Sequence, residues 1–208
     1  MFDLHLVRHG ESTWNTLGLA QGHNDRAELT SRGLRQAAET AARFRGHPVR
    51  ALYASDLRRA LQTAAAFADV LGLPVFADSR LRERSLGVLE GTAATAIDPA
   101  LTGLADGLVI DPDARPAGGE SVRDLYQRAA GFAEELAAAE DEQDDGQAGA
   151  GAGDVVVIAH GGTLRVLEAY LTGVPADQMA WPPLENARVI RIPGYVMQSH
   201  LKSRGGIR

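Results

Sequence analysis

An unbroken apolar run, Val155-Val156-Val157-Ile158-Ala159, constrains the fold of this chain more than any other segment. Such a run predicts a strand buried on both faces, and strands of this kind belong to parallel sheets that are covered by helices on each side. A second short apolar stretch, between Phe2 and Val7, predicts another buried strand. The chain is therefore expected to build its core around a central sheet.

Helical spacing of apolar residues between these strands predicts the covering layers. Thr30 is expected to cap a helix that stops at Gly46, and Ser55 to cap one that runs from Asp56 to about Leu71. Two more helices are predicted from Ser121 to about Ala139 and from His160 through Leu171, with short strands at Arg50–Ala54 and Pro74–Ala77. This alternation predicts an α/β fold, a three-layer α/β/α sandwich around a mostly parallel sheet.

The length of 208 residues suits a single domain covering 1–208. The stretch at about 140–153 is acidic and then rich in Gly and Ala, which predicts a mobile surface loop, and the tail at about 194–208 is polar. A homodimer is compatible with the sequence.

Charge and composition limit the kinds of binding partner and the kinds of chemistry that are expected for this chain. The net charge is −6 and no basic run is present, which argues against binding to nucleic acid or to an anionic membrane. No long apolar segment suggests a membrane span or a signal peptide, so a cytoplasmic location is expected. The chain has no cysteine, which excludes disulfides, thiolate metal sites and cysteine nucleophiles.

Histidines stand directly after two of the predicted strands, as Arg8-His9-Gly10 and as His160-Gly161-Gly162. The carboxyl ends of parallel strands are where α/β sheets bind ligands, so both histidines are expected at one edge. Arg59 follows a third strand, and Glu83 lies among arginines after a fourth. The sequence thus gathers imidazole, guanidinium and carboxylate groups at one site.

This combination favours phosphoryl transfer. Guanidinium groups bind phosphate oxygens bidentately, so Arg8 and Arg59 are expected to clamp a phosphoryl group. Neighbouring cations keep an imidazole neutral and nucleophilic, which favours His9 as the group that attacks phosphorus. Glu83 can protonate the leaving oxygen and then accept a proton from water. This reading needs no metal and no cofactor.

The motifs RHGES, SDLRRALQTA, LRERSLG and VVVIAHGG, in this order, resemble those of the histidine phosphatase superfamily in its phosphoglycerate-mutase-like branch. The resemblance implies a phosphohistidine on His9 and Glu83 as proton donor. It further implies a phosphate pocket made of Arg8, Arg59 and His160, with Asn15 as a supporting donor and Gly161 as a substrate contact. The expected function is hydrolysis of a small phosphate monoester.

The segment from Val88 to Gly118 separates hydrolysis from mutase action. Mutases of this branch carry added basic residues there, whereas this chain has only Arg115 in that segment. We therefore expect the pocket not to retain a second anionic group, so that water reaches the phosphohistidine. Trp181 either lines the pocket or packs in the core.

Three alternatives remain open at the level of sequence. A phosphoglycerate mutase would share the covalent intermediate, and a catalytically silent module would bind a phosphorylated ligand without turnover. A metallohydrolase with His9 and His160 as ligands lacks the clustered carboxylates and closely spaced histidine pairs that such sites usually show.

Overall fold

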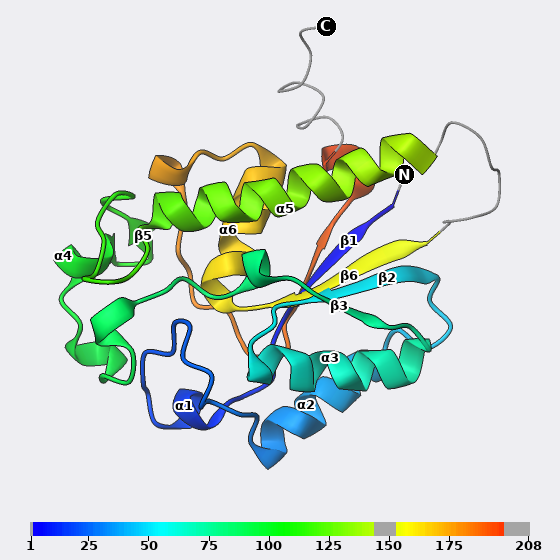
Figure 1. The fold of residues 1–208 in the computed structure, drawn as a ribbon, viewed down its shortest axis with the longest axis horizontal. Coiled ribbons are helices and arrows are strands. Elements are labelled where there is room, and N and C mark those ends of the chain that lie inside the picture. Colours follow the sequence, from blue (N-terminus) through cyan, green and yellow to red (C-terminus); the bar gives the residue numbers. More distant parts are fainter. Residues whose placement is uncertain (1, 144–152, 198–208) are drawn as a thin grey trace, which may run out of the picture.

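A five-stranded sheet with the strand order β3-β2-β6-β1-β7 forms the centre of the molecule. The computed structural model describes residues 2–143 and 153–197 (Figure 1). The strands are β1 Leu4–Arg8, β2 Val49–Ala54, β3 Val75–Ala77, β6 Asp154–Ala159 and β7 Val189–Ile192. The pairs β1–β6, β2–β6 and β2–β3 are parallel, and β7 lies antiparallel to β1. The predicted mostly parallel sheet is confirmed.

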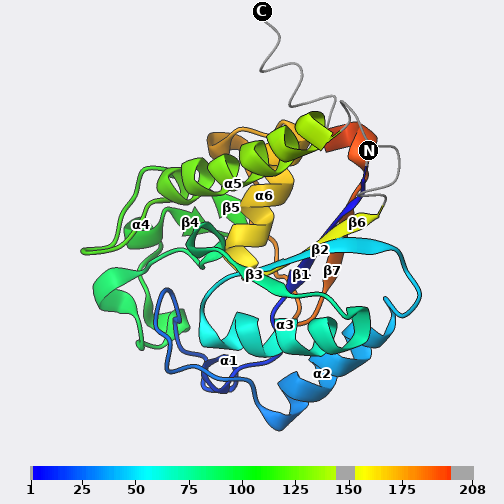
Figure 2. The ribbon, with the colours of Figure 1, turned by 45° about the vertical axis from the view of Figure 1, so that its right-hand side comes forward.

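Helices cover both faces of this sheet, as Figures 1 and 2 show. The helices are α2 Ser31–Ala42 and α3 Arg58–Leu71 on one face, and α5 Val122–Gln143 and α6 Gly161–Thr172 on the other. Because each face of the sheet is apolar, each needs such a layer to exclude water. The three-layer α/β/α sandwich is therefore confirmed as well.

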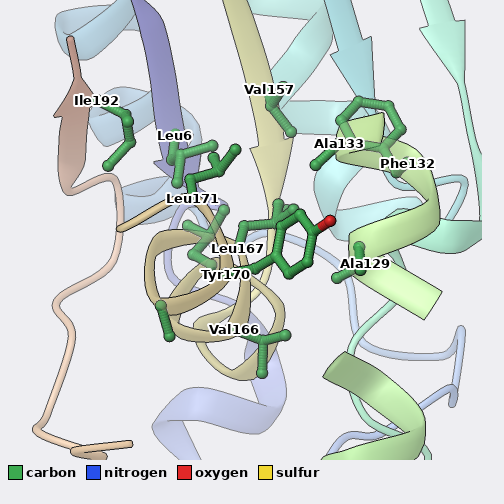
Figure 3. Packing of buried hydrophobic residues seen from close by; sticks show 14 of the residues in the cluster. Leu6, Ala129, Phe132, Ala133, Val157, Val166, Leu167, Tyr170, Leu171 and Ile192 are labelled. Atoms are coloured by element: carbon green, nitrogen blue, oxygen red, sulfur yellow. The ribbon is translucent and has the colours of Figure 1, made fainter. Parts of the chain in front are cut away.

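Successive side chains of β1 point to opposite faces of the sheet, so this strand contributes to the hydrophobic clusters on both faces. Leu4 and Leu6 pack into the cluster beneath α5 and α6, while Val7 packs into the cluster beneath α2 and α3. In Figure 3, Leu6 lies beside Leu167 and Leu171 of α6. These leucines are 0% exposed, and burying each contributes about 1.5–3 kcal/mol to the free energy of unfolding.

The predicted helix caps have different outcomes. The Thr30 hydroxyl accepts a hydrogen bond from the Gly33 amide, which confirms it as the N-cap of α2. Ser55 is not a helix cap: α3 begins at Arg58, and Leu57 is its N-cap without a side-chain hydrogen bond. The prediction at Ser55 was wrong because its hydroxyl is hydrogen-bonded to the buried His160 ring.

Several short elements have too few residues for a recognisable period. They are α1 Thr13–Thr16, the 3₁₀ helices Ser79–Leu81, Gly87–Leu89, Ala94–Ala96 and Ala176–Gln178, α4 Pro99–Thr102, β4 Leu104–Ala105 and β5 Leu108–Val109. The segment containing α4, β4 and β5 lies beyond the carboxyl ends of the strands (Figure 2). It is therefore placed to cover a site at that edge.

The end of the chain differs in part from the polar tail predicted for about 194–208. Residues 194–197 form a helical turn, in which the Gly194 amide donates to Asp3 and Met197 is buried in the core. Residues 198–208 lie outside the described part of the chain, as does most of the loop predicted at about 140–153. No helix within residues 2–143 and 153–197 is long and apolar enough to cross a membrane.

Candidate active site

A cleft of about 400 Å³ opens at the carboxyl edge of the sheet. Arg8 and His9 reach it from the end of β1, Arg59 from the start of α3, and Gly161 and Gly162 from the start of α6. Glu83 enters from the segment after β3. The structure thus brings most of the predicted site residues together in one pocket.

His9 is buried, and its ring has a defined protonation state. Its Nδ1 lies 2.7 Å from the Gly10 carbonyl oxygen, which can only accept a hydrogen bond, so Nδ1 carries the proton. The other nitrogen, Nε2, therefore keeps its lone pair. Burial, and then the charges of Arg59 and Arg8, hold the pKa of His9 well below its usual value. The ring is therefore expected to be neutral at physiological pH, with an unprotonated Nε2.

The Arg8 guanidinium has a hydrogen-bond donor for which the described residues provide no acceptor. One of its Nη atoms donates to the Leu184 carbonyl, but its buried Nε has no hydrogen-bond partner among the described residues. A buried donor without a partner is destabilising unless a ligand accepts its proton. Burial also lowers the pKa of Arg8, against the opposing attraction of Glu83. The orphaned Nε indicates an anion site beside His9.

Arg59 is 0% exposed and is held by three neutral acceptors. Its Nε donates to Nδ1 of His160 at 3.2 Å, and its Nη atoms donate to the Asn24 and Gly22 carbonyls at 2.9 Å. Burial lowers the pKa of Arg59 to about 10, so the group stays charged at neutral pH. A buried cation with neutral partners is stabilised by a bound anion.

His160 lies behind the clamp and is not among the residues that line the cleft. Its ring centroid lies 5.1 Å from that of His9. Because Nδ1 accepts from Arg59, Nε2 carries the proton and donates to the Ser55 hydroxyl at 2.8 Å. Burial, followed by the charge of Arg59, holds the pKa of His160 well below its usual value. In this arrangement His160 is a neutral ring that orients Arg59.

Two backbone amides hold the Glu83 carboxylate in the cleft. The Gly162 amide donates to Oε2 at 3.0 Å, and the Arg84 amide donates to Oε1 at 2.8 Å. A Cβ atom on Gly162 would collide with Oε1, so the close approach needs glycine at this position. The carboxyl group of Glu83 thus sits at the N-terminus of α6.

Asn15 does not line the cleft. Its Oδ1 accepts from the Ser12 amide at 3.0 Å and from Asn186 Nδ2 at 3.2 Å. Asn186 Nδ2 also donates to the His9 carbonyl at 3.1 Å, so Asn15 supports the backbone of His9 indirectly. Gln21, which sequence reasoning missed, lines the cleft instead. It lies in an irregular loop where no periodic signal marks it.

Arg165 is a further arginine of the cleft that sequence reasoning missed. It lies on α6 above Gly161, stacks over the Trp181 ring at 5.3 Å, and donates from Nε to the Pro182 carbonyl at 2.7 Å. Its position four residues after Gly161 on a predicted helix was the available signal, since such residues share a face. Trp181 lines the cleft and also packs against the hydrophobic core, so both predictions for this residue hold.

Arg165 also bears on one expectation from the sequence, that the pocket does not retain a second anionic group. Arg115, the basic residue of the segment from Val88 to Gly118, is exposed and paired with Asp124 at 2.7 Å. That expectation stays a prediction, and it considered the segment from Val88 to Gly118 alone. Helix α6 supplies a further arginine to the cleft, Arg165.

The neighbouring arginines have structural partners. Arg58 pairs with Glu28, and Arg82 binds Asp56 through two hydrogen bonds of 2.7 and 2.6 Å. Arg84 lines the cleft, but its guanidinium donates to three backbone carbonyls, those of Glu120, Thr102 and Ala114. These contacts fix the segment that covers the cleft.

A buried neutral imidazole, two buried arginines and a positioned carboxylate lie together at this edge, and these are the groups that phosphoryl transfer uses. Comparison with known protein families indicates the same class, enzymes of phosphoryl transfer. Residues 4–203 match the histidine phosphatase superfamily (branch 1), and the chain belongs to this family. The predicted family and the predicted enzyme class, a phosphatase of phosphate monoesters, are thereby confirmed.

Similar proteins include both phosphatases and mutases. A glucosyl-3-phosphoglycerate phosphatase of Mycolicibacterium vanbaalenii is 36% identical, with 91% of this chain and 83% of the relative covered. A probable phosphoglycerate mutase of Yersinia pestis is 34% identical, with 92% and 85% covered. The solved structure of a mycobacterial glucosyl-3-phosphoglycerate phosphatase with VO3 has a TM-score of 0.81 at 33% identity, covering 95% and 94%.

Proposed function

We propose that this protein hydrolyses a phosphorylated carboxylic acid through a phosphohistidine on Nε2 of His9. The proposal is carried by two atoms of adjacent residues: an unprotonated Nε2 on His9, and a buried Nε on Arg8 that has no hydrogen-bond partner within residues 2–143 and 153–197. The first atom can attack phosphorus, and the second can bind one of its oxygens. Arg59 supplies a second buried charge in the same cleft.

The reaction has two steps. In the first, Nε2 of His9 forms a bond to phosphorus, the ester P–O bond breaks, and protonated Glu83 gives its proton to the leaving oxygen. In the second, Glu83 takes a proton from water, the water oxygen attacks phosphorus, and the P–N bond breaks. Arg8 and Arg59 stabilise the charge on the equatorial oxygens in both steps.

Arg165 supports the proposed class of substrate. Its guanidinium lies in the same cleft as Arg8, because the position of a Cβ on Gly161 is 3.0 Å from Arg165 Nη1 and 3.6 Å from Arg8 Nε. A carboxylate near the phosphate ester would pair with it. The phosphatase and mutase relatives are both named for phosphoglycerates, which carry such a carboxylate.

Release of inorganic phosphate tests the reaction. With chelator present, wild-type protein should release phosphate from 3-phosphoglycerate and phosphoserine, and His9→Gln protein should not. Substantial phosphate release by the His9→Gln protein would contradict the covalent mechanism. Interconversion of phosphoglycerates without phosphate release would instead place the protein among the mutases, and neither activity would indicate a silent binding module.

A matched pair of variants tests the carboxylate contact. Arg165→Gln should raise KM for 3-phosphoglycerate about 10- to 150-fold, since a charge-assisted hydrogen bond contributes about 1.5–3 kcal/mol. It should change KM for glycerol 3-phosphate, which has no carboxylate, far less. Arg115→Gln, an exposed arginine outside the cleft, is the control. Equal losses on both substrates would show that Arg165 binds no carboxylate.

The proposed substrate is small and phosphorylated. Cytoplasmic location, a single domain over 1–208 and the absence of nucleic-acid and membrane partners stay predictions from the sequence, as does a homodimer.

A further inference from the structure

A second group of chemically active side chains lies at the opposite edge of the sheet from the cleft. His5 stands near the start of β1, Asp154 is the first residue of β6, and His47 lies in the turn between α2 and β2. His5 precedes His9 by four strand residues, or about 13 Å at the usual rise. The group is therefore separate from the proposed active site.

The three side chains converge on one point. Nε2 of His5 lies 2.8 Å from Asp154 Oδ2, and Nε2 of His47 lies 2.7 Å from the same oxygen. The three ligand atoms all lie within 4.8 Å of one another. Two imidazoles directed at one carboxylate oxygen provide the donor set, N₂O, that zinc and related divalent ions bind.

The surroundings of this group hold each ligand in place. Asp154 Oδ1 accepts from the Asp3 amide at 2.9 Å, so the carboxylate presents Oδ2 alone to the histidines. The His5 and His47 rings both meet the Phe44 ring edge to face, at 5.1 and 5.8 Å between centroids. Backbone hydrogen bonds and packing around ligands are the usual support of a metal site.

We propose that His5, His47 and Asp154 form a binding site for a divalent transition metal ion, with zinc as the best fit. The sequence predicted no metal site, because these residues are far apart along the chain and only the sheet register brings them together. A bound ion would replace the two N–H···O hydrogen bonds, with both Nε2 atoms deprotonated and a fourth position left to water. Ligand atoms around zinc lie about 3.3 Å apart, so the group must open slightly.

The side chains allow this adjustment. The His47 side chain is 39% exposed and can move outward, while the His5 side chain is 10% exposed and is fixed by β1. The ion would tie together the starts of β1 and β6 and the turn before β2. Its expected role is structural, because it is remote from the cleft and the proposed chemistry uses no metal.

Zinc binding to chelator-treated full-length protein tests the proposal, by calorimetry and by the absorption spectrum of Co²⁺ as a substitute. We expect one ion per chain, and a rise in Tm of about 5–10 °C at a hundredfold excess over Kd. His47→Gln and Asp154→Asn each alter a ligand and should weaken binding by more than the roughly 10- to 100-fold that loss of an outer-shell partner costs. Asp113→Asn, an exposed aspartate paired with Arg123, should bind as the wild type does.

Two results would overturn the site. Binding that is absent, or that is equal in the wild type and the His47→Gln protein, would show that the histidines only hydrogen-bond to Asp154. Loss of the ion in the His9→Gln protein would assign it to the active site. Because phosphate release is measured with chelator present, failure of this proposal and failure of the proposed function are distinguishable.

Discussion

Replacement of Gly162 by Ala tests how closely Glu83 must be held. A Cβ on Gly162 would collide with Glu83 Oε1 and would lie 3.2 Å from its Cδ and 3.3 Å from Cζ2 of Trp181. The carboxylate must therefore move by about 1 Å, and a misplacement of that size costs about 100-fold in rate. General acid–base catalysis contributes about 100- to 10,000-fold, so the expected loss in kcat lies near the lower limit of that range.

The fold should tolerate this change. Gly162 lies within α6, where Ala is favoured over Gly by about 1 kcal/mol. Gly131 in α5 is the matched control, because a Cβ there meets no atom of the described part of the chain within 4 Å. The Gly131→Ala protein should keep wild-type kcat.

The assay compares two kinds of leaving group. An alkyl phosphate such as 3-phosphoglycerate needs a proton on its leaving oxygen, whereas an aryl phosphate such as p-nitrophenyl phosphate needs it far less. Gly162→Ala should therefore slow the transfer of the phosphoryl group to His9 more for the alkyl ester than for the aryl ester. Rapid-quench kinetics can measure this first step separately. Wild-type rates on both esters in the Gly162→Ala protein would refute the role assigned to Glu83.

Three further predictions concern the histidines and their partners. The pKa of His9 lies well below its usual value, so kcat/KM should stay high at pH 6 and fall only at more acidic pH; a fall centred near pH 6.5 would contradict this. His9 and His160 are neutral when folded and take up protons when unfolded, so stability should decrease as pH falls below about 6.5, by up to about 1.4 kcal/mol per pH unit for each ring. Urea denaturation between pH 6.5 and 5 measures that slope, and His9→Gln should reduce it. Ser55→Ala should cost about 1–3 kcal/mol in urea denaturation, because it leaves the His160 N–H buried without its acceptor; an unchanged midpoint would exclude that hydrogen bond.

The sequence alone predicted the features of this protein that depend on short segments, namely its strands, its helices and the residues at the strand ends. A continuous apolar run at 155–159 can only be buried on both faces, so it indicated the parallel sheet and its two helical layers. The histidine directly after it had to lie at the carboxyl edge of that sheet. The same reasoning placed His9, Arg59 and Glu83 together, because each follows a strand.

The tertiary structure decided what depends on contacts between distant segments. The Ser55 hydroxyl binds the ring of His160, which lies 105 residues away and in turn contacts Arg59, so a residue that resembled a helix cap supports the site indirectly. Arg165 and Gln21 enter the cleft from a helix face and an irregular loop, and His5 meets Asp154 only through the pairing of β1 with β6. Local sequence sets which residues stand at the ends and faces of each element, because backbone geometry is local. Packing alone sets which side chains meet, because the free energy of a contact depends on both of its partners.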